Sequence, residues 1–355
     1  MAQFLLTLSL PLLKKREGMK VRLWLLWGCG WWMWCGQAAG QQLPQGSLYT
    51  LNPFVVNPAL SGAYDFADVR LSYRRQWVGL DDAPNTAYLT VHTPIGYGDK
   101  VPATTRTPRY APQNGLSPTP PAGSWRFGAG AVLLADRTGP TERNLAQLTG
   151  AAHLSLAGDW QLSAGLGAGV LQYSLRFDRI TTATPADPIL PDGRVSVLRP
   201  YFSAGILARK GNFWGGVSVL SPLAVSLAYT APAGGKVASK LLPHYYFTAA
   251  YRLDITEAWA LIPQVWIKSV GKAPLSLDGQ LRIQYFDRIW GGLQYRHKDS
   301  FGAILGMALT PNFTLSYAYE YPLSAINAVS PGSHEILLGF RFNNRAAIYC
   351  PPMGW

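Results

Sequence analysis

The side chains that could carry out hydrolysis in this sequence are a few histidines and serines. His153 and Ser155 share one face of an alternating stretch, whereas His244, His297 and His334 lie at the ends of other stretches. Catalysis would need a serine, a histidine and a carboxylate or amide within hydrogen-bond reach. Any polar-lined barrel contains such residues by chance, and the sequence has neither metal-ligand spacing nor a glycine-rich phosphate loop. We therefore expect no enzymatic activity and no catalytic, cofactor-binding or metal-binding residues.

A second group of polar side chains recurs at every other position of the alternating stretches. Side chains on a strand point alternately to its two faces, so this group is predicted to point into a common interior. Its members are Arg74, Gln76, Arg126, Arg252, Arg282, Arg296, Glu320 and Arg341. Two interpretations stay open: a polar channel or plug-binding lumen, and an interior filled by its own hydrogen bonds. Glu320, a lone acid among many arginines, favours the second.

The elements that would position these residues are segments of alternating polarity. They lie at about residues 67–78, 85–96, 124–135, 143–156, 159–177, 196–209, 212–220, 244–254, 258–269, 275–286, 288–297, 300–309, 312–321 and 333–342. Most have the roughly 9 to 11 residues that a tilted strand needs to cross a bilayer. Strands can cross lipid only as a closed sheet, because an unpaired backbone group is costly there. The pattern predicts an all-β transmembrane antiparallel barrel of about 14 strands.

The connections indicate an orientation. Tight turns follow even-numbered segments, as at 158–159, 210–211 and 310–311, while longer connections follow odd-numbered ones. Bacterial outer-membrane barrels have short periplasmic turns and longer outer loops, so both termini are predicted to be periplasmic. The proline-rich insert at 97–123 breaks this rule and is either a tolerated insertion or a partner contact.

The chain divides into four parts. Residues 1–40 are predicted to be a targeting segment, a cleaved signal peptide that starts at Met19 and ends in Ala38-Ala39-Gly40. Lipidation at Cys29 or Cys35 is the alternative. A periplasmic N-terminal segment (41–65), the barrel (66–343) and a tail (344–355) follow. Within the first of these, residues 52–64 could support the first hairpin, form a short plug or cap at the periplasmic mouth, or contact a partner.

Charge excludes one class of partner. The net charge is +12, but only 14% of residues are charged and the mean hydropathy is +0.04. The basic residues are scattered along alternating strands rather than gathered in a patch, so we expect no nucleic-acid binding. Attraction to acidic lipid headgroups of the outer membrane is the simpler explanation.

Several short motifs occur in an order that resembles one known family. They begin with two Asn-Pro turns, continue through Tyr-Arg-Arg-Gln-Trp and Asp-Arg-Thr-Gly-Pro, and close with Tyr-Glu-Tyr-Pro and Ser-His-Glu. Their singled-out members are Asn52, Pro53, Asn57, Pro58, Tyr73, Arg74, Gln76, Trp77, Pro84, Asp136, Gly139, Pro140, Glu320, His334 and Glu335. Over residues 50–351 the chain resembles the PorP/SprF family of type IX secretion system outer-membrane proteins.

The resemblance implies an integral outer-membrane component of type IX protein secretion, in some members linked to gliding motility. Its partners would be subunits of the periplasmic ring or lipoprotein components, and cargo proteins that carry a C-terminal sorting domain. The insert at 97–123 departs from the family pattern. Two other functions stay open, namely a porin or small-molecule transporter with an open lumen and a lipid-modifying barrel enzyme.

Overall fold

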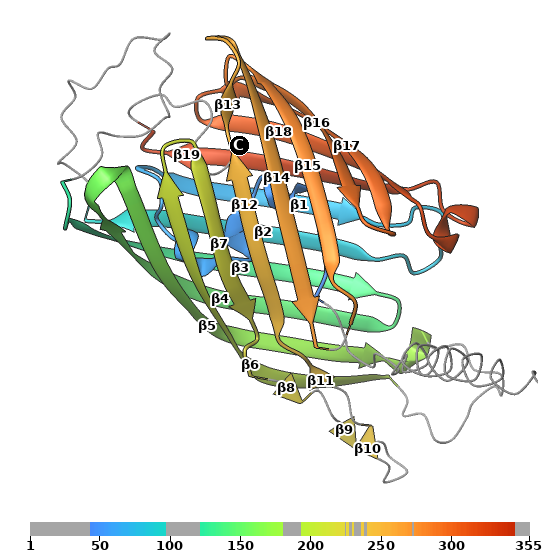
Figure 1. Ribbon diagram of the computed structural model, residues 1–355. Coiled ribbons are helices and arrows are strands. Elements are labelled where there is room, and N and C mark those ends of the chain that lie inside the picture. The colour runs from blue at the N-terminus through green and yellow to red at the C-terminus, as the bar shows by residue number, and fades with distance from the viewer. Residues whose placement is uncertain are drawn as a thin grey trace, which may run out of the picture. The chain divides into compact units, whose positions relative to one another are not determined.

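The computed structural model describes residues 43–96, 121–179, 193–223, 240–271 and 273–344, together with three two-residue stretches between 225 and 237. In this part of the chain fourteen antiparallel strands close into one barrel (Figure 1). They are β1 (Ala67–Arg75), β2 (Asn85–Ile95), β3 (Trp125–Thr138), β4 (Thr141–Ser155), β5 (Trp160–Arg176), β6 (Arg194–Lys210), β7 (Phe213–Leu220), β12 (His244–Tyr251), β14 (Trp259–Val270), β15 (Ser276–Tyr285), β16 (Ile289–Arg296), β17 (Ser300–Thr310), β18 (Phe313–Pro322) and β19 (Ser333–Phe342).

Closure comes from two pairings. The last strand pairs with the first over the whole length of β1, from Ala67 opposite Phe342 to Arg75 opposite His334. The second is the pairing of β12 with β14, which joins the two halves of the sheet. The two-residue strand β13 (Leu253–Asp254) adds to β14. Closure leaves the barrel without an open edge, as lipid requires, and confirms the predicted fold class.

Four further strands of two residues each lie in the connection between β7 and β12. Strand β8 (Val225–Ser226) pairs with β11 (Lys240–Leu241), and β9 (Tyr229–Thr230) pairs with β10 (Lys236–Val237). They form two small antiparallel ladders that are separate from the barrel sheet.

The strand bounds differ from the sequence prediction at the first hairpin. The prediction ran to residue 78, but β1 ends at Arg75, because the Gln76 amide donates to the Pro84 carbonyl and Trp77 has a φ of 51°. Trp77 is therefore a turn residue and not a member of the strand face. At the next hairpin the strands are longer than predicted, so only two residues separate β3 from β4.

Two prolines inside strands occupy positions where no ladder hydrogen bond is lost. Pro263 pairs with Leu281 of β15 on one side. On the other side the pairing with β12 stops at Gln264 and does not include Pro263. Pro94 likewise lies beyond the end of the β1 pairing, which stops at His92. A strand proline cannot donate to a neighbour, so these are the positions where it is tolerated.

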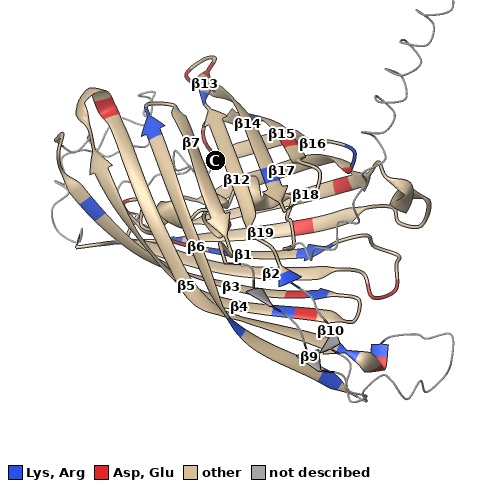
Figure 2. Ribbon diagram, turned by 60° about the horizontal axis from the view of Figure 1, so that its bottom comes forward, with Lys and Arg blue, Asp and Glu red and all other residues tan. Residues whose placement is uncertain are grey.

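The two faces of the barrel wall differ in polarity as the period of two predicts. Large apolar side chains are exposed outward, for example Leu148 (72%), Leu166 (70%) and Leu305 (63%), whereas arginine and glutamine side chains are buried inside. An apolar surface of this extent is stable against lipid rather than water. Figure 2 shows that most of the strand length carries no charge. Within the described residues no helix is long and apolar enough to span a membrane.

The interior is occupied by the chain's own N-terminal segment. Residues 43–66 form three short turns, η1 (Leu48–Thr50), η2 (Pro53–Val55) and η3 (Pro58–Leu60), and almost all of their side chains are buried. Both Asn-Pro dipeptides start a turn, since proline's fixed φ suits a first helical position. We call residues 43–66 the plug. The sequence analysis placed residues 41–65 on the periplasmic side and left open a short plug at that mouth for residues 52–64; the described part of the segment runs through the lumen.

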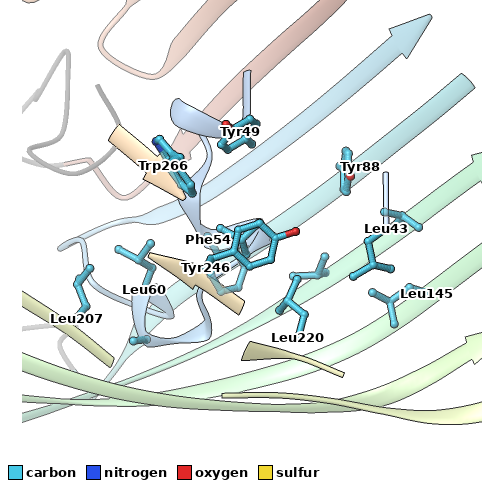
Figure 3. Packing of buried hydrophobic residues seen from close by; sticks show 14 of the residues in the cluster. Leu43, Tyr49, Phe54, Leu60, Tyr88, Leu145, Leu207, Leu220, Tyr246 and Trp266 are labelled. Atoms are coloured by element: carbon cyan, nitrogen blue, oxygen red, sulfur yellow. The ribbon is translucent and has the colours of Figure 1, made fainter. Parts of the chain in front are cut away.

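An apolar cluster holds the plug against one side of the wall. Figure 3 shows Tyr49, Phe54 and Leu60 of the plug directed toward side chains of the surrounding strands, among them Tyr246 and Trp266. The Tyr49 and Trp266 rings meet edge to face with centroids 4.6 Å apart. A smaller cluster packs Leu48 and Leu51 against β17, β18 and β19. The turns therefore find apolar partners on both sides.

Three of the predicted parts cannot be compared with the structure. The targeting segment, the greater part of the proline-rich insert and the tail after Asn344 lie outside the described residues.

Candidate functional site

The plug spans the lumen from one mouth to the other. We call the end of the barrel at Ala67 and Phe342 the terminal mouth, and the opposite end, where the connections 76–84, 271–275 and 323–332 lie, the loop mouth. Asp65 lies at the terminal mouth, 3.0 Å from Arg126 at the start of β3. At the loop mouth the Leu43 amide donates to His244 Nε2, 3.0 Å away, at the start of β12.

A buried cluster of acidic and arginine side chains forms hydrogen bonds with the plug near the loop mouth. The Glu335 carboxylate accepts hydrogen bonds from the backbone amides of Ser47 and Leu48 and, at 2.8 Å, from the Ser72 hydroxyl. Arg74 lies 3.4 Å from the same carboxylate and also donates to the Ser47 hydroxyl. These side chains come from β1 and β19, so the seam that closes the barrel is also the one that holds the plug.

The cluster continues around the wall. Glu320 accepts from Arg74 at 2.6 Å and lies 3.5 Å from Arg296. Arg296 also donates to Asp278 at 3.0 Å and to the Gly46 carbonyl at 3.2 Å. Asp278 in turn accepts from the Tyr49 hydroxyl of the plug. Alternating charge of this kind offsets the cost of burying each ion, provided that all partners are present.

The Tyr49 hydroxyl is a weaker acid than a free tyrosine. Burial, together with the nearby Asp278 carboxylate, raises the pKa of Tyr49 well above its usual range. Its hydroxyl therefore stays protonated and remains a donor to Asp278. At the terminal mouth, burial also raises the pKa of Asp65, although the Arg126 guanidinium acts in the opposite direction.

In the part of the plug nearer the terminal mouth, the plug backbone packs directly against the backbone of wall strands. A Cβ added to Gly165 would lie 2.4 Å from the Ala59 nitrogen, and one added to Gly128 would lie 2.2 Å from the Ser61 carbonyl oxygen. Glycine is thus required at these two positions of the wall. Glycine inside a strand often serves sheet curvature, but at these two positions it makes room for the plug.

Polar side chains of the wall complete this contact. His153 Nε2 lies 2.8 Å from the Ser61 carbonyl and its Nδ1 lies 2.7 Å from Ser163 Oγ. Because a carbonyl can only accept, Nε2 donates and Nδ1 accepts the serine proton. His153 therefore binds the plug backbone. Ser155, the serine that the sequence placed beside it, is not a hydrogen-bond partner of His153 in the structure.

The family-motif residues fall into three groups. Arg74, Glu320 and Glu335 meet in the buried cluster, while Asn52, Pro53, Asn57 and Pro58 belong to the plug. Asp136, Gln76, Trp77 and Pro84 line a cavity of about 670 Å³ at the loop mouth, with Leu43 to Gln45 of the plug on another side of it.

The remaining motif residues lie apart from the lumen. Tyr73 is 53% exposed on the outer face, and His334 bonds the Tyr317 hydroxyl at 2.6 Å. Gly139 and Pro140 form the turn between β3 and β4, where Gly139 has a φ of 56°.

Most of the inward-facing set is confirmed. Arg74, Arg126, Arg282, Arg296, Glu320 and Arg341 are buried, and Gln76 and Arg252 are partly buried near the strand ends. The view of Glu320 as a lone acid is wrong, because Asp68, Asp136, Asp278 and Glu335 are also buried inward. The period of two places Asp278 and Glu335 on that face and could have identified them.

Two kinds of comparison relate the chain to known proteins. Residues 38–340 match the model of a family described as "Type IX secretion system membrane protein PorP/SprF". No curated protein sequence matches the chain.

Solved barrels are similar in fold at low identity. The chain titled "CymD monoaromatic hydrocarbon channel" is 10% identical, with a TM-score of 0.47, and the match covers 86% of this chain and 94% of that one. The Ralstonia pickettii toluene transporter TbuX is 10% identical, with a TM-score of 0.46 and coverage of 81% and 92%. The Acinetobacter baumannii outer membrane protein Omp33 is 12% identical, with a TM-score of 0.43 and coverage of 79% and 100%.

Proposed function

Because this chain belongs to the PorP/SprF family of type IX secretion system membrane proteins, we propose that it serves that system as a plugged scaffold or cargo adaptor. It is an integral barrel of the outer membrane. In this role it catalyses no reaction and contributes binding surfaces at its two mouths.

The occupied lumen is the observation that carries this proposal. A porin needs a continuous aqueous path, whereas here 24 residues of the chain itself, 43–66, run from mouth to mouth. Wall glycines that lie directly against the plug backbone, and a buried ion cluster centred on Glu335, hold these residues in place. A barrel built around its own N-terminal segment is suited to presenting fixed surfaces.

The orientation of these surfaces follows from strand order. If the tight turns are periplasmic, as in other outer-membrane barrels, the terminal mouth faces the periplasmic ring. The loop mouth, where most of the motif residues gather, then faces outward. Subunits of the secretion system would bind at the terminal mouth, and cargo proteins with C-terminal sorting domains are the second class of partner. A link to gliding motility belongs to the same proposal.

A gene deletion tests the role directly. We expect the deletion strain to lose secretion of one or more proteins with C-terminal sorting domains, and the wild-type gene to restore it. The variant Leu305→Ala, on the exposed outer face of β17 away from both mouths, serves as a control that should also restore secretion. Normal secretion of all such proteins in the deletion strain would refute the proposal.

A small-molecule transporter is the second candidate, and the cavity of about 670 Å³ at the loop mouth is the observation that favours it. Planar bilayers separate the two. The scaffold proposal predicts no steady ion conductance from the purified barrel and a large conductance after deletion of residues 43–64. Steady conductance of the intact protein would favour the transporter.

A further inference from the structure

One arginine at the terminal mouth lacks a bonded partner among the described residues. Arg209 lies near the end of β6, on the same inward face as the buried Ser203 and Leu207. Its side chain is only partly buried, and it forms neither an ion pair nor a hydrogen bond with a described residue. A guanidinium withdrawn from water gains from a counter-charge, so Arg209 is available to a partner that comes from outside the chain.

The charges around Arg209 do not cancel. Burial raises the pKa of Asp65, and the guanidiniums of Arg126 and Arg209 oppose this rise, so both lie near the plug carboxylate. Of the two arginines, Arg126 forms the ion pair with Asp65, at 3.0 Å. The adjacent turns add Lys210 and Asp159, one charge of each sign. Two arginines therefore share one carboxylate, and this part of the mouth keeps one positive charge in excess.

A glutamine beside Arg209 offers further hydrogen-bond donors. Gln161 on β5 is the register partner of Arg209 and faces the lumen as well. Its carboxamide forms no hydrogen bond with a described residue. Neighbouring strands lie about 4.8 Å apart, so the guanidinium and the carboxamide can reach the same bound group.

We propose that Arg209 and Gln161 bind a carboxylate of an acidic segment that a periplasmic protein inserts into the terminal mouth. Two parallel N–H groups of a guanidinium match the two oxygens of a carboxylate, and the Gln161 amide adds a donor at one side. A phosphate has more oxygens than these two side chains can satisfy, so the site suits a carboxylate better.

The position of the site agrees with a protein partner. It lies where the plug ends beside Asp65 and the wall begins, so a segment bound there contacts both parts of the molecule. The periplasmic location of this mouth, and a secretion-system subunit as the partner, rest on the proposed function. The carboxylate site itself does not.

Fluorescence anisotropy on the purified full-length barrel in detergent tests the site, with a labelled peptide of five glutamates as the probe. The wild type should bind the peptide saturably, and Arg209→Gln should bind it about tenfold more weakly, because a charge-assisted hydrogen bond is lost. Arg209→Lys keeps the charge without the fork and should be intermediate. Both variants should fold normally on heat-modifiability gels, since no described bond is removed.

A paired arginine of the same mouth provides the control. Arg252 already lies 2.7 Å from Asp254 and 2.8 Å from Asp287. Arg252→Gln therefore removes the same charge from the same mouth but should leave the peptide affinity nearly unchanged. No saturable binding by the wild type, or an equal loss in the two glutamine variants, would overturn the proposal. So would displacement of the peptide by an equal concentration of inorganic phosphate, which would assign the site to a free anion.

Co-purification from detergent extracts tests the partner. Secretion-system subunits that co-purify with the wild-type barrel should be lost in Arg209→Gln and kept in Arg252→Gln, and equal recovery in both variants would overturn the assignment to such a partner. Peptide binding that depends on Arg209 in a protein whose gene deletion leaves secretion normal would refute the proposed function and support the carboxylate site.

Discussion

Truncation of Glu335 should release the plug from the loop mouth. Its carboxylate accepts from two plug amides and one wall hydroxyl, and it lies 3.4 Å from Arg74. Glu335→Ala therefore leaves a buried arginine with one fewer counter-charge and two amides without their acceptor.

The size of the effect follows from these contacts. Removal of one partner from a buried ion pair costs about 3 to 5 kcal/mol. If this cost falls on the local opening of residues 43–50, even about 3 kcal/mol raises the opened fraction by roughly a hundredfold. The strands of the barrel itself keep their pairing, since the backbone bonds between β1 and β19 do not involve the carboxylate.

A thiol at position 50 can report the opening. Thr50 is 1% exposed and its hydroxyl has no hydrogen-bond partner among the described residues, so Thr50→Cys removes no hydrogen bond. With Cys350 replaced by Ser, this cysteine is the only thiol after residue 40. Maleimide labelling in detergent should accelerate about a hundredfold in Glu335→Ala, in proportion to the opened fraction.

Two companion variants make the result decisive. Glu335→Gln keeps the size of the side chain but removes its charge, so labelling should accelerate by less than in Glu335→Ala. Glu257→Ala, at an exposed position in a turn, should not change the rate. Equal labelling rates in the wild type and Glu335→Ala would show that the ion cluster does not hold the plug.

Two further predictions concern the wall. Gly165→Val should displace η3 and reduce the amount of folded barrel on heat-modifiability gels. Gly279→Val should fold normally, because a Cβ at Gly279 meets nothing within 4 Å. Normal folding of both variants would contradict the close contact between Gly165 and the plug. Leu305→Arg, mid-strand and 63% exposed, should lower the free energy of unfolding in lipid by about 2 to 4 kcal/mol, measured by urea titration, while Arg75→Ala at a strand end changes it little. Equal effects of these two substitutions would argue against a lipid-facing outer wall.

The barrel could be predicted because the side chains of a strand alternate between its two faces with a period of two. A period of two identifies strand faces without knowledge of the partner strand, so residues such as Arg74 and Arg282 were placed on the correct side. The turn after β1 was harder to predict, because Trp77 continues the alternation of polar and apolar residues. The strand ends only because the Gln76 backbone amide donates to the Pro84 carbonyl.

The plug could be predicted only as one of several roles, for a physical reason. Its three turns have no period that distinguishes an interior segment from an exposed one, and many of the wall residues that bury it are distant in the sequence. Gly165 and Glu335 carry that information, but the first fits curvature equally well and the second fits any salt bridge. Only the assembled barrel brings Ala59 to one and Ser47 to the other.

The two halves of the plug are stabilised by different forces, and this sets where it can open. Near the loop mouth many of the contacts are hydrogen bonds and ion pairs to Glu335, Arg296 and Asp278, which water can replace once it enters. Toward the terminal mouth, η3 lies against Gly165 and Ser61 lies against Gly128, with no space for water between the backbones. Local opening takes the least stable contacts first. The plug therefore loosens from the loop mouth inward and stays attached at the terminal mouth, where Phe66 leads directly into the first strand of the barrel.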